Sequence, residues 1–364
     1  MADKIRLGLI GASVSGTWSS RSHLPAVQAS SDVELTAVCT TKADTAEAAR
    51  RAYGARLAFD DYLKMIASLE IDALAIVVRV PSHYAPTKAA LEAGKHVYCE
   101  WPLGRTTAEA VELASLAKAQ GLVTAVGLQA RVNPAMMHMK ELVAGGYVGE
   151  VTAVHVSLMR EGVLTRPSHR TWQRDAELGA NTLTIANGHT VDAMRFVVGD
   201  FSRLSAVVAT QAKQWLDTGT NTWLDVTSPD NILTSGWLTN GAVASAHIGA
   251  IPYAGSGYRM EIYGRDGTLV AMGEDSPQLS EVTLLGAQRN DMLKPITVPN
   301  TFNLAAPGTP SGEAVNVGQM YTLFAQAIRE GESRQPTFET AVELHRLVDA
   351  IKQASDDGRE VSCE

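Results

Sequence analysis

Residues 5–16 read IRLGLIGASVSG, an apolar run of strand length that leads directly into a glycine-rich turn. The turn follows the spacing G-x-G-x-x-G, with Ser13 at the middle position between Gly11 and Gly16. The first glycine permits a tight bend, the second a close approach to a pyrophosphate, and the third close packing of strand and helix. The N-terminus of a following helix attracts phosphate. We therefore expect a dinucleotide site here, with a plain strand-to-helix turn as the alternative.

The first third of the chain alternates short apolar runs with helical stretches. Near-continuous apolar strands separated by helices predict a parallel sheet that is covered on both faces. The expected strands are 5–10, 34–39, 73–78, 96–99 and 123–128, and the expected helices are 45–53, 85–93 and 107–119. We predict a doubly wound α/β domain, a dinucleotide-binding Rossmann domain, over residues 1–129.

The rest of the chain, residues 130–364, has a different pattern. Apolar strand-length segments between 151 and 285 follow one another closely, and turn signals such as Asn240-Gly241 and Asp266-Gly267 join several of them. Closely spaced strands with short turns predict an antiparallel sheet. Helices flank it, and we expect the helix at 338–355 to pack back towards the first domain. The second domain is thus predicted to be α+β.

Composition excludes several function classes. The 364 residues carry 31 Lys and Arg against 39 Asp and Glu, a net charge of −8, and show no basic run. We expect no nucleic-acid partner and no membrane partner. The three cysteines have neither disulfide nor metal-ligand spacing, and the N-terminus lacks the apolar core of a signal peptide. These features predict a cytoplasmic protein without a metal site.

The end of the second strand bears on the choice of cofactor. An acidic residue at this position favours NAD, because a carboxylate bonds the ribose 2′-hydroxyl. Here the strand ends in Thr40, Thr41 and Lys42, two hydroxyls and a cation that suit a 2′-phosphate. We therefore expect NADP in preference to NAD. The alternative is that Lys42 is a solvated lysine at a helix start.

Several motifs occur in a fixed order along the chain. They are His23-Leu24-Pro25-Ala26, Val78-Arg79-Val80-Pro81-Ser82-His83-Tyr84, Cys99-Glu100-Trp101-Pro102-Leu103, Val126-Gly127-Leu128-Gln129 and Gly188-His189-Thr190-Val191-Asp192. In this order the chain resembles the Gfo/Idh/MocA oxidoreductases, the glucose–fructose oxidoreductase and inositol dehydrogenase group. The resemblance implies an NAD(P)-dependent dehydrogenase or reductase for a sugar, polyol or related cyclic alcohol. It also implies an open, mostly antiparallel second sheet that forms a homo-oligomer, either a dimer or a tetramer.

Two positions depart from the family pattern. The usual Glu-Lys-Pro is Glu100-Trp101-Pro102, and the position four before His189, commonly Asp, is Ile185. His189 alone of that constellation remains, as the expected acid/base. The Trp variant is similar to a regulatory subgroup, that of the yeast galactose-regulon repressor. A non-catalytic dinucleotide-binding sensor is therefore one alternative, and cofactor-assisted elimination or glycoside cleavage is another.

The candidate site residues combine these patterns. His189 and Trp101 are expected at the reaction centre, with a helix-capping or packing role as the alternative. The expected cofactor-binding residues are Gly11, Ser13, Val14, Ser15, Gly16, Trp18, Thr40, Thr41, Lys42, Arg79, Val80, Pro81, His83, Glu100, Trp101 and Gln129. The expected substrate-binding residues are Arg131, Trp172, Lys213, His189 and Tyr253.

Overall fold

The computed structural model describes residues 3–14 and 16–363, which divide into two compact units. Unit 1 comprises residues up to Val132 together with Asn303–Glu343, and unit 2 comprises Asn133–Phe302 and Leu344–Glu364. The helix α8 (Glu313–Glu330) and the first residues of α9 (Phe338–Asp357) are therefore grouped with unit 1. The sequence-based expectation assigns them to the second domain, because it divides the chain once, after residue 129.

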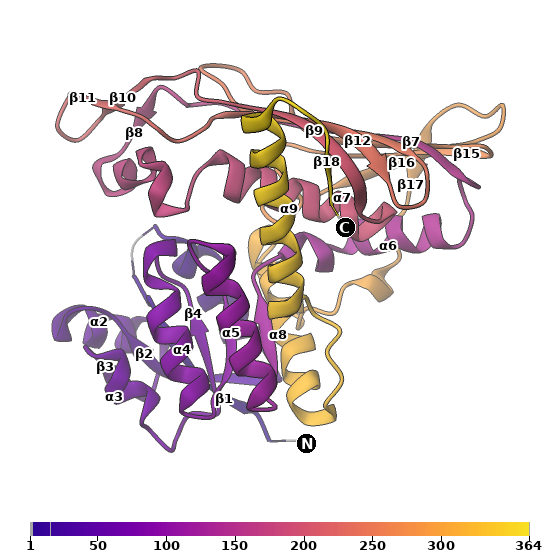
Figure 1. Ribbon diagram of the computed structural model, residues 1–364. Helices are drawn as coiled ribbons and strands as arrows, with labels where there is room; N and C mark the ends of the chain where they lie inside the picture. Colours follow the sequence, from indigo (N-terminus) through magenta and orange to yellow (C-terminus); the bar gives the residue numbers. More distant parts are fainter. Residues whose placement is uncertain (1–2, 15, 364) are drawn as a thin grey trace. The chain divides into compact units, whose positions relative to one another are not determined.

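Unit 1 contains a six-stranded parallel sheet in the order β3-β2-β1-β4-β5-β6 (Figure 1). The strands are β1 (Ile5–Ile10), β2 (Val33–Cys39), β3 (Leu57–Phe59), β4 (Ala73–Ile76), β5 (His96–Cys99) and β6 (Thr124–Val126). The connecting helices are α1 (Leu24–Ala29), α2 (Ala43–Tyr53), α3 (Tyr62–Ile66), α4 (Tyr84–Glu92) and α5 (Thr107–Ala119). This confirms the predicted doubly wound sheet.

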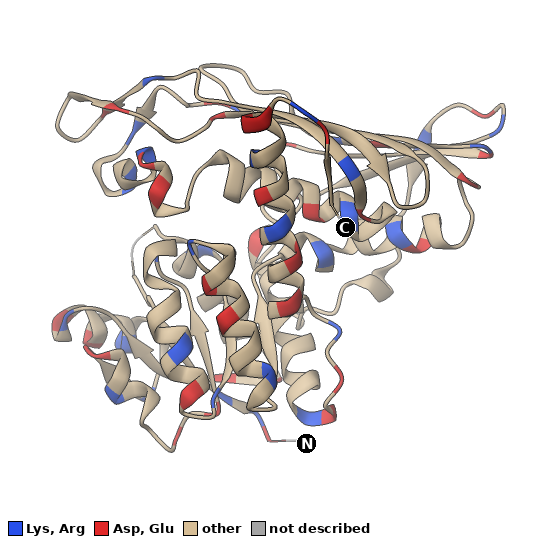
Figure 2. Ribbon diagram, in the orientation of Figure 1, with Lys and Arg blue, Asp and Glu red and all other residues tan. Residues whose placement is uncertain are grey.

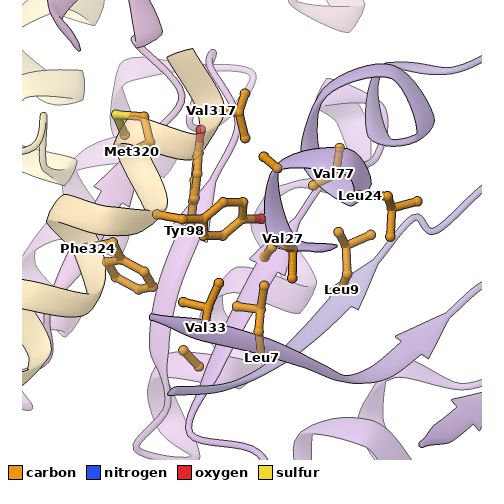
Figure 3. Close-up of a cluster of buried hydrophobic side chains, with 14 of the residues drawn as sticks. Leu7, Leu9, Leu24, Val27, Val33, Val77, Tyr98, Val317, Met320 and Phe324 are labelled. Atoms are coloured by element: carbon orange, nitrogen blue, oxygen red, sulfur yellow. The ribbon is translucent and has the colours of Figure 1, made fainter. Parts of the chain in front are cut away.

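The core of unit 1 joins the sheet to a segment far along the chain. Leu7 and Leu9 of β1 are fully buried among other apolar side chains, and Figure 3 shows Val317, Met320 and Phe324 of α8 beside Tyr98 of β5. Burying apolar surface contributes about 25 cal/mol per Å². This packing makes α8 part of the Rossmann unit, although the strands β7 to β17 separate it in sequence from β6.

Unit 2 contains a nine-stranded mixed sheet in the order β17-β16-β15-β14-β7-β13-β12-β9-β18, in which only the β7–β13 pair is parallel. Its strands are β7 (Val151–Arg160), β9 (Phe201–Ala209), β12 (Asn231–Leu238), β13 (Val243–Ala250), β14 (Gly257–Gly264), β15 (Gly267–Gly273), β16 (Thr283–Gln288), β17 (Lys294–Ile296) and β18 (Val361–Ser362). A smaller sheet joins β8 (Thr165–Arg166), β10 (Gln214–Asp217) and β11 (Thr222–Asp225). The predicted large, mostly antiparallel sheet is confirmed.

The two faces of the nine-stranded sheet differ. The helices α6 (Pro134–Ala144) and α7 (Gly188–Val198) pack against the sheet (Figure 1). Large apolar side chains remain exposed on a neighbouring trio of strands: Val207, Leu233, Trp237 and Val243 are 57%, 44%, 42% and 44% accessible. Val207 lies opposite Leu233, and Trp237 opposite Val243, so these side chains share one face.

Figure 2 shows both acidic and basic positions along α9. Among the described residues, no helix is long and apolar enough to cross a membrane.

Candidate functional site

The glycine turn after β1 is fixed by a close approach of two strand ends. The φ angle of Gly11 is +97°, and a Cβ atom at this position would lie 2.1 Å from the carbonyl oxygen of Val77. The backbone N–H groups of Gly11 and Ala12 donate to the carbonyl oxygen of Cys39, at 2.9 and 3.3 Å. Only glycine fits this position, because both its conformation and its surroundings exclude a side chain. The turn therefore holds the ends of β1, β2 and β4 together.

The turn continues into a short helical segment. One π-helical turn, Ser19–His23, precedes α1, so the helix begins three residues beyond Gly16 rather than directly after it. The Ser19 hydroxyl donates to the carbonyl oxygen of Gly11 at 2.9 Å, and the Tyr53 hydroxyl donates to that of Ser13 at 3.0 Å. These bonds hold the backbone of the turn against both neighbouring helical segments.

A cavity of about 630 Å³ opens at the carboxyl ends of β1, β2 and β4. In doubly wound sheets this edge is where ligands bind. Six of the predicted cofactor residues line the cavity: Gly11, Ser13, Thr40, Thr41, Arg79 and Pro81. The volume falls within the roughly 300–1,000 Å³ typical of small-molecule sites. The residues present therefore fit a nucleotide at this edge.

The other predicted cofactor residues do not line this cavity. Val14 is half exposed, Lys42 immediately precedes α2, and Val80 and Trp101 are buried. Gly16 has a φ of +48°, and no heavy atom lies within 4 Å of the place that a Cβ would occupy there. Ser15 lies outside the described residues.

Two polar residues next to Thr40 and Thr41 in the lining are among those that the sequence reasoning missed. Asp60 and Tyr62 follow β3 and line the same cavity as Thr40 and Thr41. The backbone N–H of Thr40 donates to the carbonyl oxygen of Phe59 at 3.1 Å, which brings the ends of β2 and β3 together. Because the ends of parallel strands meet at one edge of a sheet, the residues after β3 could have been predicted to lie near the cavity. However, β3 has only three residues and was not recognised as a strand. An acidic side chain thus stands beside the two threonines.

Glu100 and Gln129 belong instead to a buried polar network. The Glu100 carboxylate contacts His23 Nε2 at 2.8 Å and accepts from the Gln129 amide at 2.9 and 3.1 Å. His23 Nδ1 lies 2.7 Å from the Tyr321 hydroxyl. Burial and the negative charge of Glu100 raise the pKa of Tyr321 well above its usual value, so its hydroxyl stays protonated.

The distances fit a chain of hydrogen bonds through His23. In the Nε2–H tautomer, the Tyr321 hydroxyl donates to His23 Nδ1 and His23 Nε2–H donates to the carboxylate of Glu100. Gly127 allows the carboxylate to approach, because a Cβ there would lie 2.6 Å from a Glu100 oxygen. Trp18 packs edge-on to His23, with ring centroids 6.3 Å apart. The network therefore fixes the end of β5, from which Trp101 extends.

His83 connects two loops rather than facing the cavity. Its side chain is 1% exposed, and its ring nitrogens lie 2.7 Å from the carbonyl oxygen of Pro102 and 3.1 Å from that of Val78. Burial lowers its pKa, while these carbonyl contacts act in the opposite direction. The His83 ring thus contacts both the loop after β4 and the loop after β5.

In unit 2, His189 occupies the first turn of α7, and its side chain is 6% exposed. A π-helical segment, Thr182–Asn187, leads into this helix, and the Asn181 side chain caps it by accepting from the Thr184 N–H. Ile185 lies in that segment, one turn before His189. The position is compatible with an acid/base role for His189 and also with a helix-capping or packing role.

Three of the predicted substrate residues come from separate segments of unit 2. Trp172 lies in the 3-10 segment Ser168–Arg174, Lys213 is exposed before β10, and Tyr253 is 78% exposed in the loop after β13. Arg131 lies in unit 1, in the short 3-10 segment after β6. A second cavity in unit 2 is lined by none of these four residues but by Arg160, Arg166 and Arg170.

No metal centre is visible in the described part of the chain. Residues 3–14 and 16–363 contain no group of three or more His, Cys, Asp or Glu side chains arranged to hold a metal ion. Cys39 and Cys99 are buried, and burial raises the pKa of the Cys39 thiol to about 12.

Two family models match the sequence. A model of an oxidoreductase family with an NAD-binding Rossmann fold matches residues 5–128, and a model of the same family's C-terminal alpha/beta domain matches residues 140–363. Together they span most of the chain. The description of the first agrees with the cavity at the strand ends of unit 1.

Among curated proteins, the chain is 32% identical to the dehydrogenase aclE of Aspergillus oryzae, over 57% of this chain and 58% of that protein. It is 28% identical to the galactose/lactose metabolism regulatory protein GAL80 of Saccharomyces cerevisiae, over 66% of this chain and 60% of that one. It is 26% identical to the levoglucosan dehydrogenase of Pseudarthrobacter phenanthrenivorans, over 85% and 84%. The chain thus aligns with little more than half of the first two proteins.

Solved structures share the fold over nearly the whole chain. A super-repressor mutant of Gal80p from Saccharomyces cerevisiae superposes with a TM-score of 0.88 at 23% identity, covering 99% of this chain and 98% of that one. A levoglucosan dehydrogenase in complex with NADH and L-sorbose gives 0.86 at 22% identity, covering 100% of both chains. An enzyme and a regulator therefore have the same architecture.

Proposed function

The chain belongs to the Gfo/Idh/MocA oxidoreductase family, and we propose that it is an NAD(P)-dependent dehydrogenase or reductase. Its substrate is a sugar, a polyol or a related cyclic alcohol. The observation that carries the proposal is the cavity at the strand ends of unit 1, with Gly11 at its base. Two relatives, the levoglucosan dehydrogenase and a D-glucoside 3-dehydrogenase of Escherichia coli, have names that agree with this substrate class.

The residues of the cavity suit a dinucleotide. Gly11 leaves the backbone bare where a pyrophosphate approaches, Ser13 offers a hydroxyl, and Arg79 supplies a positive charge on the same wall. When bound, a nicotinamide cofactor accepts or supplies the hydride. Ser13 and Arg79 are therefore proposed to bind and orient its phosphates.

His189 is proposed as the general acid/base. Oxidation of an alcohol breaks a C–H bond, whose electron pair leaves as hydride, and an O–H bond, whose proton needs an acceptor. An imidazole, with an ordinary pKa of about 6.5, can take that proton near neutral pH. In the reverse direction His189 returns the proton to the carbonyl oxygen. The product of oxidation is then a ketone or lactone.

Trp101 cannot move a proton, because its only polar hydrogen is a weakly acidic indole N–H. We propose that it forms an apolar wall beside the reacting atoms and excludes water from them. Its side chain is 5% exposed and follows Glu100, which the His23 network holds in place. The acid/base work would then rest on His189 alone.

We propose NADP as the preferred cofactor, with NAD as the alternative. Thr41 and Lys42 are exposed at the end of β2, where a 2′-phosphate would add negative charge. Asp60, on the same cavity wall, works against that charge. The Thr40 hydroxyl is already bonded to Thr45 at 2.6 Å and to the carbonyl oxygen of Lys42 at 2.9 Å, so Thr41 and Lys42 carry the preference.

A non-catalytic sensor is the second candidate. It is favoured by Trp101 and Ile185, which replace the Lys and Asp implied by the family pattern. The likeness to GAL80, whose name describes a regulatory protein, agrees with it. Such a protein would bind the dinucleotide in the same cavity and turn nothing over.

Measurement of cofactor reduction across a panel of sugars and polyols, with NADP and with NAD, tests these proposals. We expect turnover with at least one alcohol and a loss of at least about 100-fold in kcat for His189→Ala, the scale of general acid/base catalysis. His247→Ala is the matched control, because His247 lies on β13 outside both cavities. Unchanged turnover in His189→Ala would refute its role. Tight dinucleotide binding without turnover would favour the sensor.

The exposed apolar face of unit 2 is proposed as the interface of a homo-oligomer, either a dimer or a tetramer. Val207, Leu233, Trp237 and Val243 form neighbouring exposed pairs on adjacent strands. Contiguous exposed apolar side chains mark interaction surfaces. A second copy of the chain would cover them.

A further inference from the structure

A small polar cavity of about 160 Å³ lies wholly within unit 2. Its wall contains three arginines from successive segments: Arg160 ends β7, Arg166 ends β8, and Arg170 lies in the 3-10 segment that follows. Trp215 of β10 and Ile185 complete the wall. The cavity is smaller than the roughly 300–1,000 Å³ that holds a whole ligand, so it is sized for one group of a larger molecule.

Arg166 is held in place before any ligand arrives. Its guanidinium carbon lies 4.5 Å from the centre of the Trp215 ring, and Nη1 donates to the carbonyl oxygens of Gly162 and Thr165. Its Nε is buried without a hydrogen-bond partner among the described residues. Burial, followed by the charges of Arg170 and Arg160, lowers the pKa of Arg166 to about 10. The positive charge of Arg166 is thus partly shielded from water and lies near the positive charges of Arg160 and Arg170.

Three carboxylates lie on or beside this wall: Glu161 and Asp230 line the cavity, and Asp275 contacts Arg160. Asp275 pairs with Arg160 at 3.0 Å. Asp230 accepts from the backbone N–H groups of Gln211, at 2.9 Å, and of Ala212, at 2.7 Å. The hydrogen bonds of Arg166 go to neutral carbonyls, and Arg170 donates to the amide oxygen of Gln173 at 3.3 Å. Among the described residues, the positive charge of Arg166 is therefore not paired with a carboxylate and can face a ligand.

Trp215 is the second observation that points to a ligand. Its side chain is 5% exposed, and its indole N–H is buried with no acceptor among the described residues. A buried donor without a partner costs about 1–3 kcal/mol. An oxygen placed in the cavity would satisfy this donor and face the guanidinium groups.

We propose that this cavity binds the carboxylate or phosphate group of an acidic sugar, which makes the substrate an anionic sugar rather than a neutral one. The inference rests on the proposed dehydrogenase function for the reaction, but the binding site itself does not depend on turnover. Guanidinium forks match the two oxygens of a carboxylate or phosphate. The Trp215 N–H adds a third donor.

Ile185, which replaces the Asp implied by the family pattern, is also a residue of this cavity. It lies on the cavity wall, one helical turn before His189. A carboxylate at this position, as the family pattern implies, would pair with the arginines and repel an anionic substrate. An apolar side chain leaves the positive charges to the ligand. The loss of the usual Asp and the gathering of arginines are therefore one adaptation.

The test is calorimetric titration of the full-length protein with D-glucuronate, D-glucose 6-phosphate and D-glucose, in parallel with cofactor reduction on each. We expect one of the two anions to bind at least about 10-fold more tightly than glucose, and to bind less tightly as salt is raised. Arg166→Gln should weaken that binding about 10- to 100-fold, the scale of a lost charge-assisted hydrogen bond. Ile185→Asp should act in the same direction.

Arg170→Gln and Arg289→Gln complete the set of variants. Arg170 is exposed, so its replacement tests the cavity even where Arg166→Gln fails to fold, and it should also weaken anion binding. Arg289 is an exposed arginine of unit 2 outside the cavity, and its replacement should leave binding unchanged. The two anions distinguish a carboxylate from a phosphate site.

The outcomes separate the two proposals. Equal binding of glucose and both anions, binding of neither anion, or anion binding that survives both cavity variants overturns the anion site. Cofactor reduction on neutral sugars alone, unaffected by Arg166→Gln and Arg170→Gln, also overturns it while the dehydrogenase stands. Anion binding that is lost in the cavity variants, without cofactor reduction, supports the site and refutes the dehydrogenase.

Discussion

Replacement of Gly11 by alanine tests the close approach on which the cofactor cavity depends. The residue has a φ of +97°, and the added Cβ would lie 2.1 Å from the carbonyl oxygen of Val77 and 2.8 Å from its carbonyl carbon. Ordinary van der Waals contact begins at 3.4 Å, so either β1 or the end of β4 must move. Val77 also lines the cavity, and its displacement would distort the wall that faces the dinucleotide.

Two effects add up at Gly11. The left-handed backbone conformation costs an L-residue roughly 1–2 kcal/mol, and overpacking a tight site costs roughly 1–3 kcal/mol more. We therefore expect Gly11→Ala to lower the free energy of unfolding by about 2–5 kcal/mol. Gly16→Ala is the matched control, because its φ is +48° but no heavy atom lies within 4 Å of the added Cβ. It should show the conformational cost alone, about 1–2 kcal/mol.

Urea unfolding followed by circular dichroism measures both variants, and fluorescence titration with NADPH and NADH measures their cofactor affinity. We expect Gly11→Ala to lose more stability than Gly16→Ala and to bind either dinucleotide at least about 10-fold more weakly than the unmodified chain. Equal stability losses, together with intact cofactor binding in Gly11→Ala, would show that the contact with Val77 does not shape the cavity.

Three other residues give independent tests. Asp60→Asn removes a negative charge from the cavity wall. Titration should then show NADP binding about 3- to 10-fold more tightly, with little change in NAD binding. An unchanged affinity for NADP would mean that the 2′-phosphate does not lie near Asp60. His345 is buried, and burial lowers its pKa to about 4, so the folded chain takes up its proton later than the unfolded chain as the pH falls. The neutral, buried His345 contributes its full stability above about pH 6.5, and this contribution is lost as the pH falls from about 6.5 to about 4. His345→Leu should therefore reduce the fall in unfolding free energy over this pH range by about 3 kcal/mol. A fall as steep as that of the unmodified chain would contradict this role of His345. Trp237→Glu places a charge on the exposed face of the large sheet and should shift the oligomer towards monomer, as measured by mass photometry at nanomolar concentration. Trp223→Glu, at another exposed tryptophan on β11, is the control. An unmodified chain that is already monomeric would contradict the proposed interface.

The sequence was sufficient for the turn and for much of the cavity wall because both follow from local rules. A strand that runs into Gly11 and Gly16 predicts the bend, and parallel strands place Thr40, Thr41 and Arg79 at one edge. The same rule would have found Asp60, had the three-residue strand β3 been recognised. Short strands carry too little periodicity to be distinguished from loops.

The interactions that escaped prediction depend on distant parts of the chain. His23 contacts Tyr321, 298 residues further on, and no local pattern announces that pair. The spacing of Arg160, Arg166 and Arg170 is visible in the sequence, but their meeting with Trp215 depends on a two-residue pairing between β8 and β10.

The two departures from the family pattern have different chemical consequences. Replacement of the usual lysine by Trp101 removes one proton-transferring group, but oxidation of an alcohol needs only one acceptor for its hydroxyl proton. Replacement of Asp by Ile185 removes a charge from the wall of the arginine cavity, where it would compete with an anionic ligand. If His189 accepts the hydroxyl proton, the proposed reaction still has the one proton acceptor that it requires, despite both changes. The His189→Ala variant therefore decides between catalysis and sensing more directly than restoring either lost residue, because the restored lysine or aspartate would add a group that the reaction does not need.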